Sequence, residues 1–259
     1  MNSKFAIGLI QLPLYWEAPE KNRKAIEGYL ERLKQPLDLV LLPEMFTSGF
    51  TMHPQKVAES MEGPTILWMQ NWAKQINAAL GGSLAIKEGA LFYNRFVIAT
   101  PSGALYFYDK RHTFTLAGED KVYKKGTHNG LFKYKGWTLC MRICYDLRFP
   151  VWSRNTHNYD ILLYVANWPK PRIKAWDTLL QARAIENLSY VVGVNRIGSD
   201  ANKHSYPGHS AVYDPLGYQL SPACSSEEGI IRAELDFQYL QAQRKQLRFL
   251  EDQDSFELY

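Results

Sequence analysis

Three short segments of this sequence each end a hydrophobic run in one reactive side chain. Glu44 follows LVLLP, Lys110 follows LYFYD and Cys144 follows LCMRI. These side chains are a carboxylate, an ammonium and a thiol, which can serve amide cleavage as base, oxyanion-stabilising cation and nucleophile. Ligand sites of α/β sheets gather at strand ends. The shared position of the three residues therefore predicts that they form one site.

Cys144 has the most informative position of the three. A sharp polar turn, YDLRFP, follows it directly. Such a junction turns a side chain out of the sheet and leaves the next backbone N–H groups free to bind a developing oxyanion. A lone cysteine after a buried strand is more often a small hydrophobic residue, and we interpret Cys140 in that way. Cys224 is expected in a loop with no group nearby to activate it.

Glu44 and Lys110 would supply what the thiol needs. Glu44 ends a run expected to be buried on both faces, where loss of hydration makes a carboxylate a better proton acceptor. Lys110 would lower the pKa of the thiol and donate to the carbonyl oxygen of a substrate. Taken singly, Glu44 is as well explained by a loop cap or an arginine partner, and Lys110 by a surface lysine. The occurrence of Glu44, Lys110 and Cys144 together at strand ends favours an amide-cleaving site.

The elements that must position these residues are predicted from hydrophobic periodicity and turn residues. Strands are predicted for residues 5–12, 39–42, 83–88, 93–100, 105–108, 137–143, 161–166, 190–195, 210–213, 218–220 and 230–235. Helices are predicted for residues 17–33, 64–80, 171–187 and 236–248, the second of them ended by Gly81 and Gly82. Turns at 101–103 and 214–217 predict two hairpins.

The alternation of strands and helices, interrupted by hairpins, predicts a mixed α/β layered fold with two sheets inside and helices outside. No internal repeat, low-complexity tract or linker-like segment divides the chain, so residues 1–259 are expected to form a single domain. Residues 249–259 mix Asp, Glu, Phe and Leu. We expect this tail either to dock on a partner subunit or to fray as a terminus.

Composition excludes several classes of function. Hydrophobic residues make up 46% of the chain and charged residues 22%, as in ordinary globular proteins. The net charge of +4 is spread along the chain without a basic run or a zinc-finger spacing, so no nucleic-acid partner is expected. The three cysteines include no CxxC pair, and no run approaches the roughly 20 apolar residues of a membrane span. We expect a cytoplasmic protein with no metal site and no membrane partner.

The three reactive segments resemble the nitrilase superfamily of carbon–nitrogen hydrolases, whose members use a Glu-Lys-Cys triad. The similarity spans most of the chain and is carried by Gln11 and by the motifs PEMF, YDKRH, CYDLRFP, ANWP, RAIEN, GHS and DPLG. CYDLRFPVW with ANWPKPR is similar to the ω-amidase branch, most of all to its bacterial YafV-type members. The resemblance implies a four-layer αββα sandwich of the nitrilase type, commonly paired into homodimers, with no metal or organic cofactor.

The resemblance also implies catalytic roles. Glu44 is expected to be the general base, Lys110 the oxyanion-stabilising cation and Cys144 the nucleophile. Many relatives carry a second glutamate in the loop after the lysine, which positions the lysine and the water. Glu119 is expected to take that role, with Asp120 as the competing acid, since this loop has FTL where relatives commonly pair an aliphatic with an acidic residue.

Further residues are expected around the substrate by the same resemblance. Arg148 corresponds to an arginine placed to hold the substrate's carboxylate, a task that suits a guanidinium, although a buried pair with an acidic residue would explain it nearly as well. Tyr145 is expected to give a backbone N–H to the oxyanion. Asn167 and Trp168 are expected to shape the pocket. Phe46 is expected on the acyl side, with simple core packing as an equal alternative.

The resemblance implies that the chain uses water to hydrolyse small dicarboxylate monoamides, such as α-ketoglutaramate and α-ketosuccinamate, through a Cys144 thioester. Within the superfamily, the triad is equally compatible with another amidase, a carbamoylase or a nitrilase. A non-catalytic interaction protein that kept the fold is an alternative of a different class, which the intact triad disfavours. A redox sensor is disfavoured because no resolving cysteine lies at a suitable spacing.

Overall fold

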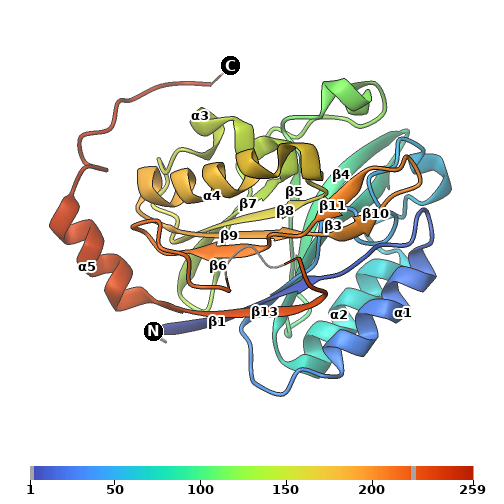
Figure 1. The fold of residues 1–259 in the computed structure, drawn as a ribbon, viewed down its shortest axis with the longest axis horizontal. Helices are drawn as coiled ribbons and strands as arrows, with labels where there is room; N and C mark the ends of the chain where they lie inside the picture. The colour runs from blue at the N-terminus through green and yellow to red at the C-terminus, as the bar shows by residue number, and fades with distance from the viewer. Residues whose placement is uncertain (1–2, 223–225, 259) are drawn as a thin grey trace.

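Two mixed β-sheets lie face to face in the computed structural model, which describes residues 3–222 and 226–258 (Figure 1). The six-stranded sheet has the order β13 (Gly229–Asp236), β1 (Lys4–Gln11), β2 (Leu39–Leu41), β3 (Ala79–Glu88), β4 (Leu91–Ala99) and β5 (Leu105–Asp109). The five-stranded sheet has the order β12 (Ala211–Tyr213), β9 (Tyr190–Asn195), β8 (Ile161–Ala166), β7 (Trp137–Ile143) and β6 (Leu131–Tyr134). A separate hairpin joins β10 (Ile197–Ser199) to β11 (Ser205–Pro207).

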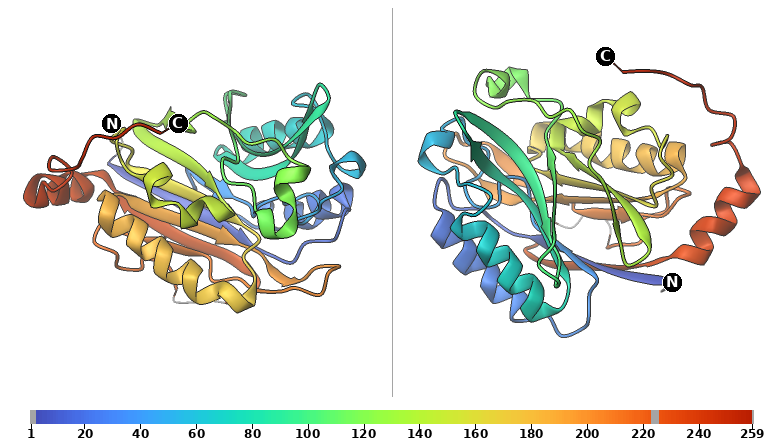
Figure 2. Two further views of the ribbon diagram at one scale, coloured as in Figure 1. Left: turned by 90° about the horizontal axis from the view of Figure 1, so that it is seen from above. Right: turned by 180° about the vertical axis from the view of Figure 1, so that it is seen from behind.

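Helices cover the outer face of each sheet, as Figures 1 and 2 show. The α-helices are α1 (Pro19–Leu30), α2 (Pro64–Ile76), α3 (Pro150–Ser153), α4 (Ile173–Asn187) and α5 (Phe237–Leu247). The short 3-10 helices are η1 (Pro54–Lys56), η2 (Thr115–Ala117), η3 (Glu119–Lys121), η4 (Cys144–Arg148) and η5 (Lys170–Arg172). Helices α1 and α2 pack on the six-stranded sheet, and α4 packs on the five-stranded sheet.

Alternating side chains fix these layers, because successive residues of a strand point to opposite faces. In β1, Ile7 and Leu9 belong to the core between the sheets, whereas Ile10 packs toward α1 and α2. In β8, Leu163 points into the same central core and Tyr164 packs toward α4. The result is the predicted αββα sandwich, with one core between the sheets and one under each helical layer.

Strand direction brings the ends of distant strands together. β1, β2 and β3 run parallel, and β7, β8 and β9 run parallel in the second sheet. β4 and β5 are antiparallel neighbours that reverse direction twice, so β5 points the same way as β2. Consequently, the residues that follow β2 and β5 emerge at one edge of the first sheet, as the sequence predicted for Glu44 and Lys110.

Several predicted elements differ from the structure. Helix α2 ends at Ile76, because Asn77 adopts a left-handed conformation with φ 50° and caps it. Gly81 and Gly82 are not helix terminators: they lie within β3, which begins at Ala79. A Cβ on Gly82 would come within 2.7 Å of the Phe46 ring, so close packing rather than a turn requires glycine there.

Other differences concern short segments. The predicted strand 218–220 is reduced to a single bridge between Tyr213 and Gln219, and β6, β10 and β11 were not predicted. The first helix is shorter than predicted, spanning Pro19–Leu30. The interpretation of Cys224 falls outside the described residues. No helix in the part of the chain that the structure describes is long and apolar enough to cross a membrane.

Candidate active site

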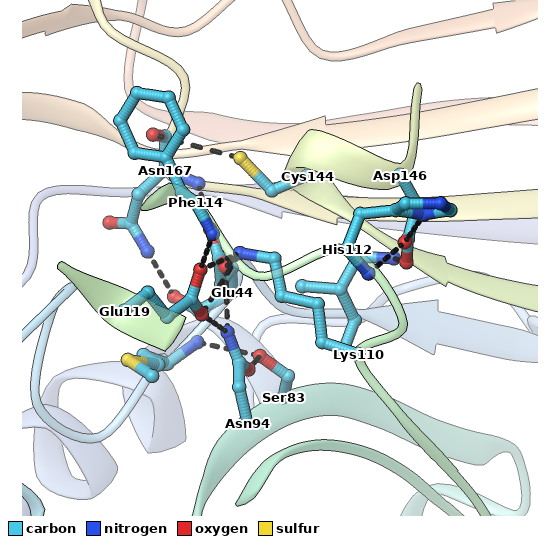
Figure 3. A network of polar contacts seen from close by, with 12 residues as sticks. Glu44, Ser83, Asn94, Lys110, His112, Phe114, Glu119, Cys144, Asp146 and Asn167 are labelled. Carbon is cyan, nitrogen blue, oxygen red and sulfur yellow. Dashed lines mark hydrogen bonds and ion pairs between the residues drawn. The ribbon is translucent and has the colours of Figure 1, made fainter. Parts of the chain in front are cut away.

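Lys110 lies between two carboxylates at the edge of the first sheet. Its Nζ is 2.8 Å from Oε1 of Glu44 and 2.9 Å from Oε2 of Glu119, and none of the three side chains is more than 1% exposed. Figure 3 shows the ammonium pointing between the two carboxylates. Asp120, the competing acid, is exposed. The structure therefore brings Glu119, and not Asp120, to the lysine.

Backbone and side-chain donors hold Glu44 in place. Its Oε2 accepts a hydrogen bond from the backbone N–H of Asn167 at 2.9 Å, and its Oε1 accepts one from Nδ2 of Asn94 at 2.8 Å. Asn94 also donates to Glu119 at 3.1 Å and itself accepts from Ser83 at 2.8 Å. These contacts fix the carboxylate before any substrate arrives. Asn94 and Ser83 were not predicted as site residues, because each lies inside an ordinary strand and no motif marks it.

Cys144 occupies a strained corner between β7 and η4. Its φ of 44° lies in the left-handed region, which a non-glycine residue rarely adopts. The side chain is only partly buried, and its Sγ lies 4.0 Å from the carbonyl oxygen of Asn167. This corner aims the thiol away from the five-stranded sheet and toward the Lys110 cluster, as the predicted junction between strand and turn requires.

Burial controls the protonation of the cluster. Burial alone would lower the pKa of Lys110, but attraction to Glu119 and Glu44 outweighs it and raises the pKa. Burial raises the pKa of Glu119, helped by Glu44 and opposed by Lys110. Burial, and then Glu44, raise the pKa of the Cys144 thiol well above its ordinary value despite the opposing effect of Lys110. The predicted effect of Lys110, which lowers the pKa of the thiol, is present, but burial and Glu44 outweigh it.

A protonated resting thiol has a direct chemical consequence. A thiol is a poor nucleophile until it loses its proton. Since burial and Glu44 outweigh Lys110 and raise the pKa of the Cys144 thiol, transfer of the proton to a base as the new bond to sulfur forms is favoured. Glu44 is the buried carboxylate whose charge and hydrogen bond both act on the thiol. The direction of the pKa shift of Cys144 thus favours general-base attack over attack by a preformed thiolate.

Asp146 connects the lysine segment to the cysteine corner. Its Oδ1 accepts hydrogen bonds from the backbone N–H of His112 at 3.0 Å and from Nδ1 of the same ring at 2.8 Å. Its Oδ2 accepts from the hydroxyl of Tyr108 at 2.8 Å and from the backbone N–H of Ile143 at 2.9 Å. Tyr108 and His112 flank the lysine, and Ile143 precedes the cysteine. Asp146 is therefore a positioning residue for both.

Asp146→Asn is expected to lower kcat on the order of 10- to 100-fold with little change in KM, because a small displacement of reacting groups is costly. The NH2 group of the new asparagine would face N–H or O–H donors that now bind the Asp146 carboxylate, so the free energy of unfolding should fall by about 1–3 kcal/mol. Steady-state kinetics and thermal unfolding test both effects, with the exposed Asp120→Asn as the matched control. Normal kcat in a folded Asp146→Asn protein would contradict the positioning role.

A cavity of about 410 Å³ opens beside the cluster. Three of its lining residues contact the catalytic groups. Phe50 lies with its ring 5.1 Å from Nζ of Lys110, the backbone N–H of Phe114 donates to Glu119, and Asn167 contacts both Glu44 and Cys144. The hydroxyl group of Tyr206, a further lining residue, interacts electrostatically with Cys144. The other lining residues are Trp16, Met52, His53, Leu116, Ala117, Pro169, Arg172, Asp200, Asn202 and His204. The catalytic side chains do not themselves line the cavity, which adjoins them through these lining residues.

The remaining predicted substrate residues lie in different places. Asn167 lines the cavity. Tyr145 follows the nucleophile directly, and its ring packs 4.9 Å from that of Phe114. Trp168 is only 3% exposed and belongs to the core under α4, and the guanidinium of Arg148 stacks on it at 5.0 Å. Neither Trp168 nor Arg148 is among the residues lining the cavity, so their predicted roles stay predictions.

Of the two alternatives for Phe46, the structure shows core packing and not a place on the acyl side. Its side chain is fully buried and packs against Trp68 of α2 at a ring distance of 6.2 Å, on the outer face of the first sheet. Phe50, four residues further, takes the place next to the lysine instead. The sequence contains no periodic pattern over this loop, so packing alone decides which phenylalanine faces the cavity.

No group of three or more His, Cys, Asp or Glu side chains suited to a metal ion occurs within residues 3–222 and 226–258. Cys140 is buried, and burial raises the pKa of its thiol. It is inert in this setting, in agreement with the interpretation of its position on the strand.

Comparison with known proteins gives consistent matches. The carbon–nitrogen hydrolase family model matches residues 6–245. The chain is 42% identical over 254 residues to Omega-amidase YafV of Yersinia enterocolitica, with 98% of each chain covered. It is 33% identical to 2-oxoglutaramate amidase of Bacillus subtilis (strain 168), covering 96% of this chain and 97% of the relative. The crystal structure of XC1258 from Xanthomonas campestris, a CN-hydrolase superfamily protein with an arsenic adduct in the active site, matches with a TM-score of 0.96, 40% identity and 99% of both chains covered.

Proposed function

The chain belongs to the carbon–nitrogen hydrolase family, the nitrilase superfamily, and from this premise we propose that it is an ω-amidase. Its substrates would be small dicarboxylate monoamides, such as α-ketoglutaramate and α-ketosuccinamate, hydrolysed to the diacid and ammonia. The observation that carries the proposal is the meeting of Glu44, Lys110 and Cys144 beside a cavity that also contains an arginine, Arg172. The names of the relatives support the same substrate class.

In the first half-reaction, Sγ of Cys144 attacks the amide carbon while Glu44 accepts the thiol proton. A carbon–sulfur bond forms and the carbonyl oxygen becomes an oxyanion, stabilised by Lys110 and by the backbone N–H of Tyr145. Glu44 then gives the proton to the amide nitrogen, the carbon–nitrogen bond breaks, and ammonia leaves a thioester behind.

Asn167 supports this step. Its Nδ2 donates to the carbonyl oxygen of Glu44 at 2.6 Å, which fixes the orientation of its amide. Its Oδ1 is buried without a hydrogen-bond partner among the described residues. A buried unpaired acceptor is costly, so an N–H of the substrate amide would relieve that cost on binding.

In the second half-reaction, water takes the place of ammonia. Glu44 accepts a proton from the water as its oxygen attacks the thioester carbon, and the same two donors stabilise the second oxyanion. Collapse breaks the carbon–sulfur bond, returns the proton to sulfur and releases the acid. Glu119 acts through Lys110, holding the ammonium in place between the two carboxylates.

A panel of compounds of matched length tests the substrate class. The panel comprises α-ketoglutaramate, glutaramate, valeramide, 4-cyanobutyrate and a carbamoyl-amino acid. We expect kcat/KM for the two monoamides to exceed that for the neutral amide by about 100-fold, because a charged hydrogen bond at the distal end contributes roughly 1.5–3 kcal/mol. Faster turnover of the nitrile would indicate a nitrilase, and faster turnover of the carbamoyl compound a carbamoylase.

The proposal extends to location and assembly: a cytosolic homodimer in which the C-terminal segment docks on the partner subunit. After α5, residues 249–258 turn back towards α3 (Figure 1), where Leu258 lines a shallow hollow with Val151 and Trp152, and Phe256 stays 43% and Leu258 48% exposed. Exposed apolar side chains of this kind favour a subunit contact. The molar mass in solution of the full chain and of a chain ending at residue 248 tests this; a monomeric full chain would contradict it.

A further inference from the structure

We propose that Arg172, rather than Arg148, binds the carboxylate at the far end of the substrate and thereby selects dicarboxylate monoamides. This inference rests on the proposed function for the identity of the substrate, but its structural basis is separate. It depends on which cation faces the cavity, how that cation is held and which other charges surround it.

Among the described residues that line the cavity, Arg172 is the only lysine or arginine. Its side chain is partly buried, and within residues 3–222 and 226–258 it forms no ion pair and no side-chain hydrogen bond. Its guanidinium lies 5.3 Å from the ring centre of Phe114, which also lines the cavity. A guanidinium presents several donors that match a carboxylate in bidentate geometry. Arg172 therefore has the donor capacity that a carboxylate ligand needs.

The backbone at Arg172 is held firmly. Its N–H donates to the carbonyl oxygen of Pro169 at 3.0 Å, and its own carbonyl oxygen accepts from the indole N–H of Trp168 at 2.8 Å. Trp168 is in turn fixed through its backbone N–H, which donates to Asn195 at 2.8 Å. The ordering cost of placing this cation is thus partly met before a ligand binds. Trp168 contributes to the pocket indirectly, by supporting Arg172.

Asp200 is the one acidic residue lining the cavity in the part of the chain that the structure describes, and its carboxylate already accepts several hydrogen bonds. Its Oδ1 accepts from the backbone N–H groups of Asn202 and His204 at 2.9 Å each, and its Oδ2 accepts from the hydroxyl of Tyr206 at 2.8 Å. Burial alone would raise the pKa of Asp200, but these hydrogen bonds, that of Tyr206 first, lower it. The uncompensated charge facing the cavity is that of Arg172.

Arg148 shares part of this environment: it is partly buried, and within residues 3–222 and 226–258 its side chain also forms no ion pair and no hydrogen bond. Its guanidinium stacks at 5.0 Å on Trp168, which is almost fully buried in the core under α4. Arg148 does not line the cavity. A ligand with its amide at Cys144 therefore extends past Asn167 toward Arg172. Its amide end is bound by a residue of η4 and its carboxylate end by a residue of η5.

The test compares Arg172→Gln with Arg148→Gln, and with Lys170→Gln as a matched control that removes an exposed charge two residues away. For Arg172→Gln we expect the ratio of kcat/KM for glutaramate to that for valeramide to fall on the order of 30- to 100-fold, chiefly through KM. Arg172→Lys should recover only part of this kcat/KM ratio, because an ammonium cannot form the two parallel hydrogen bonds that a guanidinium makes to a carboxylate. An equal or larger fall in Arg148→Gln, or an unchanged ratio in Arg172→Gln, overturns the inference.

A second readout does not depend on amide turnover. Glutarate should protect Cys144 from alkylation by iodoacetamide in the wild type and in Lys170→Gln, but not in folded Arg172→Gln. If the wild type hydrolyses no dicarboxylate monoamide, the proposed function fails, while Arg172-dependent protection still supports the carboxylate site. Absence of protection in the wild type, or protection that survives in Arg172→Gln, overturns the site itself.

Discussion

Replacement of Lys110 by Met is expected to lower both activity and stability. Methionine keeps much of the length of the side chain but removes the charge that stabilises the oxyanion, so kcat should fall on the order of 10²- to 10³-fold. Glu44 and Glu119 would remain buried without their cation. Removing one partner of a buried ion pair costs roughly 3–5 kcal/mol of unfolding free energy.

The stability loss should depend on pH. In the wild type, burial and Glu44 raise the pKa of Glu119 while Lys110 opposes them. In Lys110→Met that opposition is gone, so the folded protein should take up a proton that the unfolded chain lacks at neutral pH. A carboxyl whose pKa is raised in the folded state gives stability at low pH that is lost as pH rises. The deficit relative to the wild type should therefore shrink from pH 8 to pH 5.

Thermal or denaturant unfolding at several pH values measures this effect, with the exposed Lys121→Met as the matched control. Lys121 lies on η3, close in sequence to Glu119, but its side chain points to solvent. A deficit in Lys110→Met that is constant over the pH range, or equal to that of Lys121→Met, would contradict the idea that Lys110 compensates buried carboxylates.

Glu44→Gln is expected to remove the base while leaving the nucleophile in place. The loss in kcat should reach at least about 10³-fold, since proton transfer is needed in both half-reactions. The thiol should become more acidic at the same time. Burial is the first cause of the raised pKa of Cys144 and Glu44 the second, whereas Lys110 lowers it. With Glu44 neutral, the pKa of Cys144 should fall.

Alkylation of Cys144 by iodoacetamide as a function of pH separates the two effects. In the wild type the rate should still be rising at pH 9, because the thiol stays protonated well above its ordinary pKa. In Glu44→Gln the same curve should shift toward lower pH, so the less active protein is alkylated faster near pH 7. A wild-type plateau below pH 8 would mean that a thiolate exists at rest and that Glu44 is not needed to form it.

Much of the fold could be predicted because its signals are local. The apolar runs of β1, β7, β8 and β9 and the helical spacing in α4 are properties of neighbouring residues, and they determine the layers. The boundary between α2 and β3 could not be predicted, because the close packing of Gly82 on Phe46 joins residues far apart in sequence. The predicted strand at 218–220 failed because only one residue there pairs with β12.

In the site, too, local signals could be predicted and contacts between distant residues could not. Glu44, Lys110 and Cys144 were visible because each ends a strand, and strand ends converge in this class of fold. The partners that orient them, such as Asn94 and Asp146, act through contacts between elements that no periodic pattern reveals. Arg148 and Arg172 could not be told apart by sequence, because both follow strands of the second sheet. Only the cavity separates them.

The measurement that tests the central claim most directly is ammonia release from α-ketoglutaramate by the wild type and by Cys144→Ser, both checked for folding by thermal unfolding. Serine replaces the sulfur alone, so the cavity and the Lys110 cluster should persist. The account predicts rapid release by the wild type and a loss on the order of 10⁴-fold or more in the variant. Comparable release by both proteins, or none by a folded wild type, would contradict it.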